Sequence, residues 1–143
     1  MALVEPSDYV AILDLISRYS RTFDSSDVTA FANLFTDDAR LDTPVGNAAS
    51  RSEIETWARD RWAELRKDGI RPTHFQTNTV LDTSSPDHAT GSTQLLLVWH
   101  HVSTNKSELT GTAIYEDEFQ RTDRGWKFLR RSIGWGGPTQ ENP

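Results

Sequence analysis

The period of the hydrophobic pattern changes near Pro72, and this change limits the folds open to the chain. Before Pro72, apolar residues recur three and four positions apart, which is the spacing of one helical face. After it, long segments rich in threonine, branched aliphatic and aromatic residues are separated by turn residues, as in antiparallel strands. Helices followed by long strands indicate an α+β domain whose helices pack on one face of a mainly antiparallel sheet. A sheet of such long strands is expected to curve, so that the helices close a deep pocket at its open end.

Two helices are expected at the start of the chain. The first runs from about Ser7 to Phe23, with Ser7 as its N-cap. Its apolar stripe consists of Tyr9, Ile12, Ile16, Tyr19 and Phe23. A short second helix is expected to end at Asp37, before a brief strand over 39–42. The apolar residues of this second helix are Phe31, Leu34 and Phe35.

A third helix is predicted by a capping box, in which Ser50 is followed three residues later by Glu53. Gly69 is expected to end this helix. Its broad apolar face consists of Ile54, Trp57, Ala58, Trp62 and Leu65. The four strand segments that follow are expected at 73–82, 89–102, 109–121 and 126–135. The tail over 136–143 is expected to be loose.

Composition narrows the class of protein. The 143 residues suffice for one domain with a sizeable core, so a single domain over 1–143 is expected. The formal net charge of −6 argues against nucleic acid or an anionic membrane surface as a partner. The absence of cysteine excludes disulfides and thiolate chemistry. No apolar run approaches the ~20 residues that span a bilayer, and the N-terminal residues lack a secretion-signal pattern, so a cytoplasmic protein is expected.

Two titratable residues lie at the ends of apolar segments, since Asp24 closes the first helix and His74 opens a strand. A buried carboxylate beside a histidine makes a general base without a metal or cofactor. Strand alternation puts Gln76 and Asn78 on the face of His74, and this polar face either lines a cavity or faces water. The alternative interpretation of Asp24 is a helix-end residue that supports the following turn.

The remaining polar pairs are weaker candidates. His100 and His101 point to opposite faces of a strand, so no metal site is expected there. Arg130 and Arg131 also point to opposite faces, and one of them is expected inside, beside a carboxylate or the cavity. No phosphate-binding loop or dinucleotide fingerprint is present, and no cofactor is expected.

Five short segments occur in a specific order along the chain. They are Tyr19-Ser-Arg-Thr-Phe-Asp24, Phe35-Thr-Asp-Asp38, His74-Phe-Gln-Thr-Asn78, Gly111-Thr-Ala-Ile-Tyr115-Glu-Asp117 and Gly125-Trp-Lys-Phe-Leu-Arg-Arg131. Together they resemble the SnoaL-like branch of the nuclear-transport-factor-2 superfamily, which consists of small cone-shaped α+β domains with a deep pocket. The chain is most similar to the dehydratase-type members, namely scytalone dehydratase, bile-acid 7α-dehydratase and hexachlorocyclohexane dehydrochlorinase.

This resemblance implies roles for individual residues. In those enzymes an aspartate on the first helix orients a strand histidine, which removes a proton next to the leaving group. The matching residues are Asp24 and His74. Tyr19 matches a pocket tyrosine, and Arg131 matches an arginine that stabilises the departing anion. The residues expected to bind substrate are Asn78, Trp99 and Tyr115.

The leading hypothesis is a cofactor-independent and metal-independent lyase or isomerase that acts on a small apolar cyclic molecule. Elimination and isomerisation begin with the same proton removal, so these residues do not separate them. The alternatives are a polyketide or terpenoid cyclase of the same fold and a non-catalytic small-molecule-binding or accessory module. Both faces of the strand over 95–100 are apolar. One face is expected to line the cone and the other to meet a helix or a partner subunit, in a homodimer or homotrimer.

Overall fold

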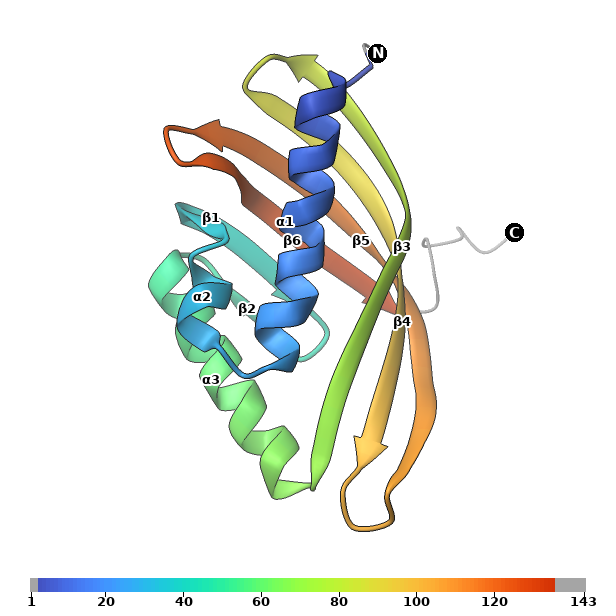
Figure 1. The fold of residues 1–143 in the computed structure, drawn as a ribbon. Helices are drawn as coiled ribbons and strands as arrows, with labels where there is room; N and C mark the ends of the chain where they lie inside the picture. Colours follow the sequence, from blue (N-terminus) through green and yellow to red (C-terminus); the bar gives the residue numbers. More distant parts are fainter. Residues whose placement is uncertain (1–2, 136–143) are drawn as a thin grey trace, which may run out of the picture.

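The computed structural model describes residues 3–135, and the expectation of a loose tail over 136–143 concerns residues outside that range. Helices come first and long strands follow, as predicted (Figure 1). The helices are α1 (Pro6–Asp24), α2 (Val28–Ala32) and α3 (Arg51–Lys67). The strands are β1 (Phe35–Thr43), β2 (Gly46–Ala48), β3 (Ile70–Ser85), β4 (His88–His101), β5 (Lys106–Thr122) and β6 (Gly125–Trp135).

The strands form one sheet in the order β2-β1-β6-β5-β4-β3. The pair β1–β6 is parallel and every other pair is antiparallel. Figure 1 shows the sheet curving around α1, with all three helices on its concave side. Strands β3, β4 and β5 are the longest of the sheet, with 16, 14 and 17 residues. The predicted α+β architecture with a curved sheet and N-terminal helices is confirmed.

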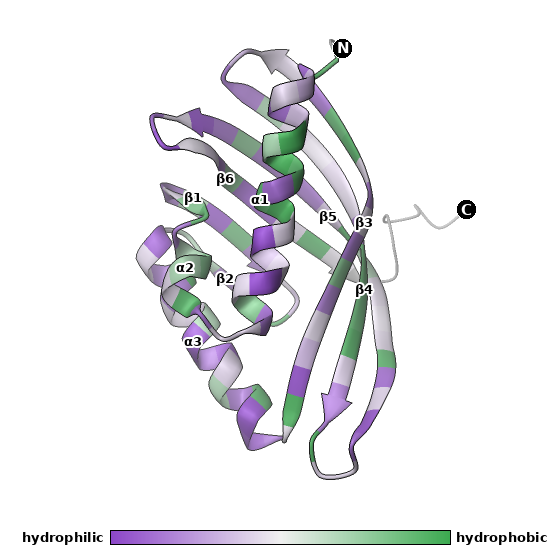
Figure 2. Ribbon diagram, in the orientation of Figure 1, coloured by the Kyte–Doolittle hydropathy of each residue, from purple (hydrophilic) through white to green (hydrophobic). Residues whose placement is uncertain are grey.

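Helix α1 packs through one stripe of side chains, and Figure 2 shows apolar and polar bands alternating along it. Ile12, Ile16 and Phe23 are buried on this stripe. The helix begins at Pro6 rather than at Ser7, and the predicted Ser7 N-cap is wrong. Proline is well suited to the first helical position because its φ is fixed and the missing N–H would have had no helical partner.

The second helix is shorter than expected, and the strand after it begins earlier. Helix α2 ends at Ala32, and β1 already starts at Phe35, where Phe35 pairs with Phe128 of β6. The backbone N–H of Phe128 donates to the carbonyl of Leu34 at 2.9 Å. The helical spacing of the apolar residues was misleading, because inward-facing residues on either side of a tight turn can have the same spacing.

Both predicted ends of α3 are confirmed. The Glu53 N–H donates to Ser50 Oγ at 3.1 Å, while the Glu53 carboxylate accepts the Ala49 N–H at 2.8 Å. Gly69 follows the helix with φ +68°, a conformation that favours glycine. This turn leads directly into β3, so the capped helix fixes where that strand starts.

Strand β3 bends sharply at its middle. Its pairing with β4 shifts between Thr77 and Val80, and Asn78 has φ +53°. Between these pairs β3 has one residue more than β4, and one extra residue reverses the alternation of side chains. Consequently the inward-facing positions are His74 and Gln76 before the bend and Thr79 after it, and Asn78 is exposed.

Candidate active site

A cavity of about 290 Å³ lies between α1, α3, the β1–β2 turn and the concave face of the sheet. Most of its wall is apolar, and the apolar residues are Phe23, Pro44, Val45, Trp57, Leu65, Pro72, Leu95, Leu97, Trp99 and Ile133. The polar residues on the wall are Tyr19, Thr43, Arg61, His74, Thr110 and Tyr115. An apolar cavity with a few converging polar groups is the usual form of a small-molecule site.

The structure brings Asp24 and His74 together at this cavity. Asp24 Oδ1 lies 2.6 Å from His74 Nδ1, and Asp24 Oδ2 accepts the His74 backbone N–H at 2.9 Å. An ionised carboxylate can only accept hydrogen bonds, so a proton shared in this contact lies on Nδ1 of the ring whenever Asp24 is ionised. His74 Nε2 has no hydrogen-bond partner within residues 3–135, and the ring lines the cavity wall. His74 can therefore accept a proton from a molecule in the cavity.

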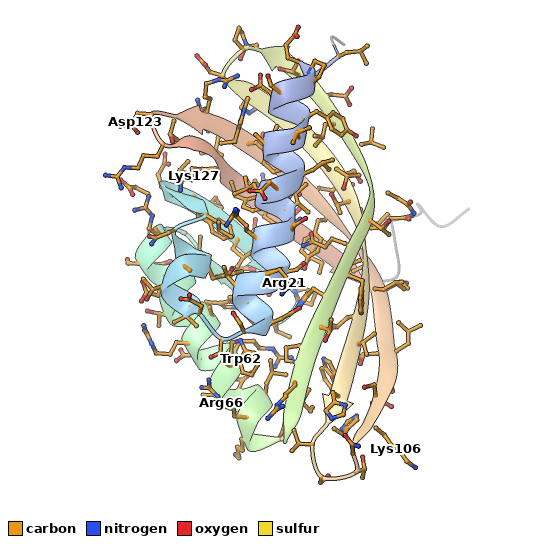
Figure 3. All side chains as sticks on the ribbon, in the orientation of Figure 1. Arg21, Trp62, Arg66, Lys106, Asp123 and Lys127 are labelled. Atoms are coloured by element: carbon orange, nitrogen blue, oxygen red, sulfur yellow. The ribbon has the colours of Figure 1, made fainter. Side chains whose placement is uncertain are left out.

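Helix α3 holds the end of α1 in place. The Trp62 indole N–H donates to the Phe23 carbonyl, one residue before Asp24. Arg66 lies over the Trp62 ring, 5.1 Å from its centroid, and donates to Ser26 Oγ in the turn after α1. Figure 3 labels Trp62 and Arg66 on the lower half of α3, next to the lower end of α1. These contacts restrict the position of the Asp24 carboxylate.

Tyr19 and Tyr115 line the cavity beside His74. The Tyr19 ring lies edge-on to the ring of His74, with centroids 6.4 Å apart, and 5.6 Å from the ring of Tyr115. Burial raises the pKa of Tyr19, although the nearby charge of Arg131 acts in the opposite direction. Burial likewise raises the pKa of Tyr115 well above that of a free tyrosine. Both hydroxyls thus remain protonated near neutral pH, and because the Tyr115 hydroxyl donates to that of Tyr19, the Tyr19 hydroxyl is the one left to donate to a ligand.

Arg131 is fully buried behind these two tyrosines. Its guanidinium carbon lies 3.6 Å from the Tyr115 ring centroid and 4.2 Å from that of Tyr19. It donates to both carboxylate oxygens of Asp117, at 2.8 and 3.1 Å, in a bidentate pair. Burial raises the pKa of Asp117 to about 6, against the lowering effect of Arg131. Arg131 is not part of the cavity wall, and its contact with the wall residues is through the rings of Tyr19 and Tyr115.

Gln76 links this buried ion pair to helix α1. Its Oε1 accepts from Arg131 Nη2 at 2.7 Å, while its Nε2 donates to Ser20 Oγ at 2.6 Å and to the Ile16 carbonyl at 3.0 Å. The sequence interpretation assigned no site role to Gln76 or Asp117. Asp117 lies on the same buried face of β5 as Tyr115 and Phe119. An acidic residue at an inward-facing strand position could have marked Asp117 as a candidate from the sequence.

The remaining predicted residues lie in different places. Trp99 and Tyr115 line the cavity, as their expected substrate-binding role requires. Asn78 does not, because the bend in β3 turns it outward, where it donates to Gln94 Oε1 on β4. The structure therefore places Asn78 outside the cavity in which it was expected to bind substrate. The expectation for the arginine pair is confirmed, since Arg131 is buried while Arg130 is exposed and pairs with Asp42 at 3.3 Å.

Two further observations concern the described part of the chain. Over residues 3–135, no group of three or more histidine, aspartate or glutamate side chains is arranged to hold a metal ion. No helix in the same range is both long and apolar enough to cross a membrane.

The open curved sheet with helices at its N-terminal side is the fold seen in the structure of a nuclear-transport-factor-2-like protein. The family model of the SnoaL-like domain matches residues 5–132. The chain belongs to the SnoaL-like domain family.

Individual relatives agree with this membership. The gamma-hexachlorocyclohexane dehydrochlorinase of Sphingobium indicum is 37% identical over 59 residues, which are 41% of this chain and 37% of that enzyme. The match thus spans little more than a third of the curated relative. The structure of ActVI-ORFA from Streptomyces coelicolor superposes with a TM-score of 0.83 at 19% identity, covering 92% of this chain and 97% of the other. Hexachlorocyclohexane dehydrochlorinase LinA-type3 from Novosphingobium barchaimii gives a TM-score of 0.76 at 24% identity, covering 91% and 87%.

Proposed function

We propose that this chain is a cofactor-independent proton-transfer enzyme that acts on a small, largely apolar cyclic molecule. The observation that carries the proposal is the contact between Asp24 and His74 at the wall of an apolar cavity. Both side chains are largely shielded, with exposed fractions of 17% and 12%. A shielded imidazole with one nitrogen held by a carboxylate and the other free has the arrangement of a general base.

In the proposed reaction, His74 Nε2 removes a proton from a ring carbon of the substrate. The electron pair of the broken C–H bond forms a carbon–carbon double bond. In an elimination the leaving group on the adjacent carbon departs with its bonding pair. In an isomerisation the charge is held on a conjugated oxygen until the proton returns to another carbon. The Asp24 carboxylate stabilises the imidazolium that forms.

The Tyr19 hydroxyl is the proposed donor to the oxygen or leaving group that becomes negative. Its place on the wall beside His74 supports this role. Arg131 is proposed as a positioning residue, because its guanidinium packs on the rings of Tyr19 and Tyr115 and carries positive charge close behind them. Trp99 and Tyr115 are proposed to contact the substrate ring.

Elimination, isomerisation and cyclisation all start with this proton removal. The partial sequence match to a dehydrochlorinase supports elimination as the first reaction to test. A non-catalytic binding module would use the same cavity without turnover, and the test must separate it from an enzyme.

The test measures chloride release from gamma-hexachlorocyclohexane and isomerisation of a cyclic β,γ-unsaturated ketone. We expect turnover of at least one of them by the wild-type protein, and a loss of ~10²-fold or more in His74→Ala, the usual scale for a general base. The control is His100→Ala, since His100 is not on the cavity wall and contacts Ser107 Oγ. Equal rates in wild type and His74→Ala would contradict the assignment, and a ligand bound without turnover would favour the binding module.

A further inference from the structure

Helix α3 contributes an arginine to a face that is otherwise apolar. Trp57, Arg61 and Leu65 line the cavity at successive spacings of four, so they lie along one face of the helix. An inward-facing helix stripe is normally apolar. Arg61 is an exception, because it is a charged residue on the side of α3 that faces the cavity.

The Arg61 side chain is only partly engaged by the protein. Its Nη1 donates to Glu64 Oε2 at 2.9 Å, and this is its only hydrogen bond or ion pair within residues 3–135. Glu64 is 65% exposed, whereas Arg61 is 24% exposed. An exposed pair of this kind contributes little stability, and a guanidinium has five N–H donors. Arg61 therefore has donors left for a ligand.

The rest of the cavity wall provides no competing charge. No aspartate or glutamate of the described residues lines it, and Asp24 lies behind the His74 ring. The buried Arg131 is already paired with Asp117. Arg61 is thus the one arginine or lysine on the wall among residues 3–135, and its field favours an anion inside the cavity.

We propose that Arg61 binds a carboxylate on the substrate, while the apolar ring of the same molecule extends toward His74. This inference rests on the proposed function and makes it more specific, because it predicts that small cyclic acids bind more tightly than neutral cyclic molecules of the same shape. It also assigns Arg61 as a specificity-determining residue. A guanidinium recognises a planar carboxylate through two parallel hydrogen bonds, so a neutral amide of the same shape binds less well.

The experiment compares the binding of 2-naphthoate and 2-naphthamide, which share a ring and differ in charge. Binding is followed by tryptophan fluorescence, since Trp57 and Trp99 line the cavity. We expect wild type to bind the naphthoate about tenfold more tightly than the amide, the scale of one charge-assisted hydrogen bond. Arg61→Gln should reduce this preference to about twofold or less. The matched control is Arg59→Gln, because Arg59 lies on the same helix, pairs with Glu55 and is not on the cavity wall.

Glu64→Gln provides a test in the opposite direction. It removes the acceptor that competes for Arg61, so naphthoate should bind about two- to threefold more tightly. Weaker naphthoate binding in this variant would contradict the proposal.

Binding is measured without turnover, so the two proposals fail separately. His74→Ala should keep the preference for naphthoate even if it abolishes catalysis. An active enzyme that binds both ligands equally, or neither of them, would overturn the role of Arg61 and leave His74 as the base. A preference that survives Arg61→Gln, or disappears in Arg59→Gln, would also overturn it, because Arg61 would then serve only as an aliphatic cover of the cavity wall.

Discussion

Asp24 contacts His74 through both of its carboxylate oxygens, one on the imidazole Nδ1 and the other on the backbone N–H. The two residues are 50 positions apart, at the last residue of α1 and near the start of β3. Because one carboxylate fixes both the ring and the strand that carries it, the ring orientation depends on how α1 ends. The hydrogen bond from Trp62 to the Phe23 carbonyl secures that end from α3.

Asp24→Asn is expected to lower kcat about 100-fold while KM changes little. The amide of asparagine has only one acceptor atom, so it cannot accept from both the ring and the backbone of His74. The measurement is steady-state kinetics on the substrate that wild type turns over. Asp14→Asn is the control, since Asp14 is exposed on the same helix and pairs with Arg18. Equal losses in both variants would mean that Asp24 has no special role.

Tyr19→Phe is expected to lower kcat about tenfold, because it removes a hydrogen-bond donor to the developing charge. Since burial raises the pKa of Tyr19, the size of this loss should not change between pH 6 and pH 9. The measurement compares the pre-steady-state rates of wild type and Tyr19→Phe at several pH values. Tyr9→Phe removes a hydroxyl that donates to the Thr79 carbonyl outside the cavity, and it should leave kcat unchanged. A pH-dependent loss in Tyr19→Phe would show that the hydroxyl ionises during the reaction.

The buried pair of Asp117 and Arg131 predicts a pH dependence of stability. Burial raises the pKa of Asp117 to about 6 in the folded protein, above the ~3.9 expected after unfolding. The folded state thus holds this proton more tightly, and the contribution of Asp117 to stability is present below about pH 4 and is lost as the pH rises through 6. Relative to Asp117→Asn, the free energy of unfolding of wild type should fall by ~2–3 kcal/mol between pH 4 and 7.

Urea unfolding of both proteins across this range measures the difference. Asp82→Asn is the control, because Asp82 is only half-buried and lies near the turn at the end of β3. A difference that stays constant, or that rises with pH, would show that the attraction of Arg131 outweighs burial and keeps Asp117 ionised.

The convex face of the sheet carries an apolar patch, formed by Phe75 of β3, Leu96 and Val98 of β4 and Leu109 of β5. Phe75, Leu96 and Leu109 are 54%, 40% and 62% exposed. We propose that a second copy of the chain covers this patch, because adjacent exposed apolar side chains on neighbouring strands favour association.

Sedimentation velocity should therefore show an oligomer for wild type and a monomer for the double variant Leu96→Lys/Leu109→Lys. Val10→Lys, on the exposed face of α1, should not change the oligomeric state. A monomeric wild type, or a double variant that still associates, would contradict this prediction.

Patterns within short segments predicted much of the fold. The Ser50–Glu53 capping box, the glycine at 69 and the four strand segments each depend on neighbouring residues, and each is confirmed. The start of β1 was missed because Leu34 and Phe35 are buried equally well by a helix and by a turn followed by a strand. What decides between them is the pairing of Phe35 with Phe128, a contact across 93 positions.

Less of the candidate site than of the fold could be predicted from the sequence. Asp24 and His74 could be singled out because each ends an apolar segment, and the family resemblance assigned them roles. The outward position of Asn78 could not be predicted from the sequence, because it depends on a shift in the pairing of β3 with β4. The contact of Gln76 with Arg131 joins residues 55 positions apart, and its existence depends on the curvature of the sheet.

The central claim is that Asp24 keeps the proton of His74 on Nδ1 and leaves Nε2 free to act as a base. Nitrogen-15 NMR of the histidine rings tests it directly, because the two ring nitrogens have distinct shifts when protonated and unprotonated. We predict that neutral His74 carries its proton on Nδ1 in wild type and loses this preference in Asp24→Asn. A His74 ring protonated on Nε2 in wild type, or unchanged by the Asp24→Asn substitution, would contradict the account.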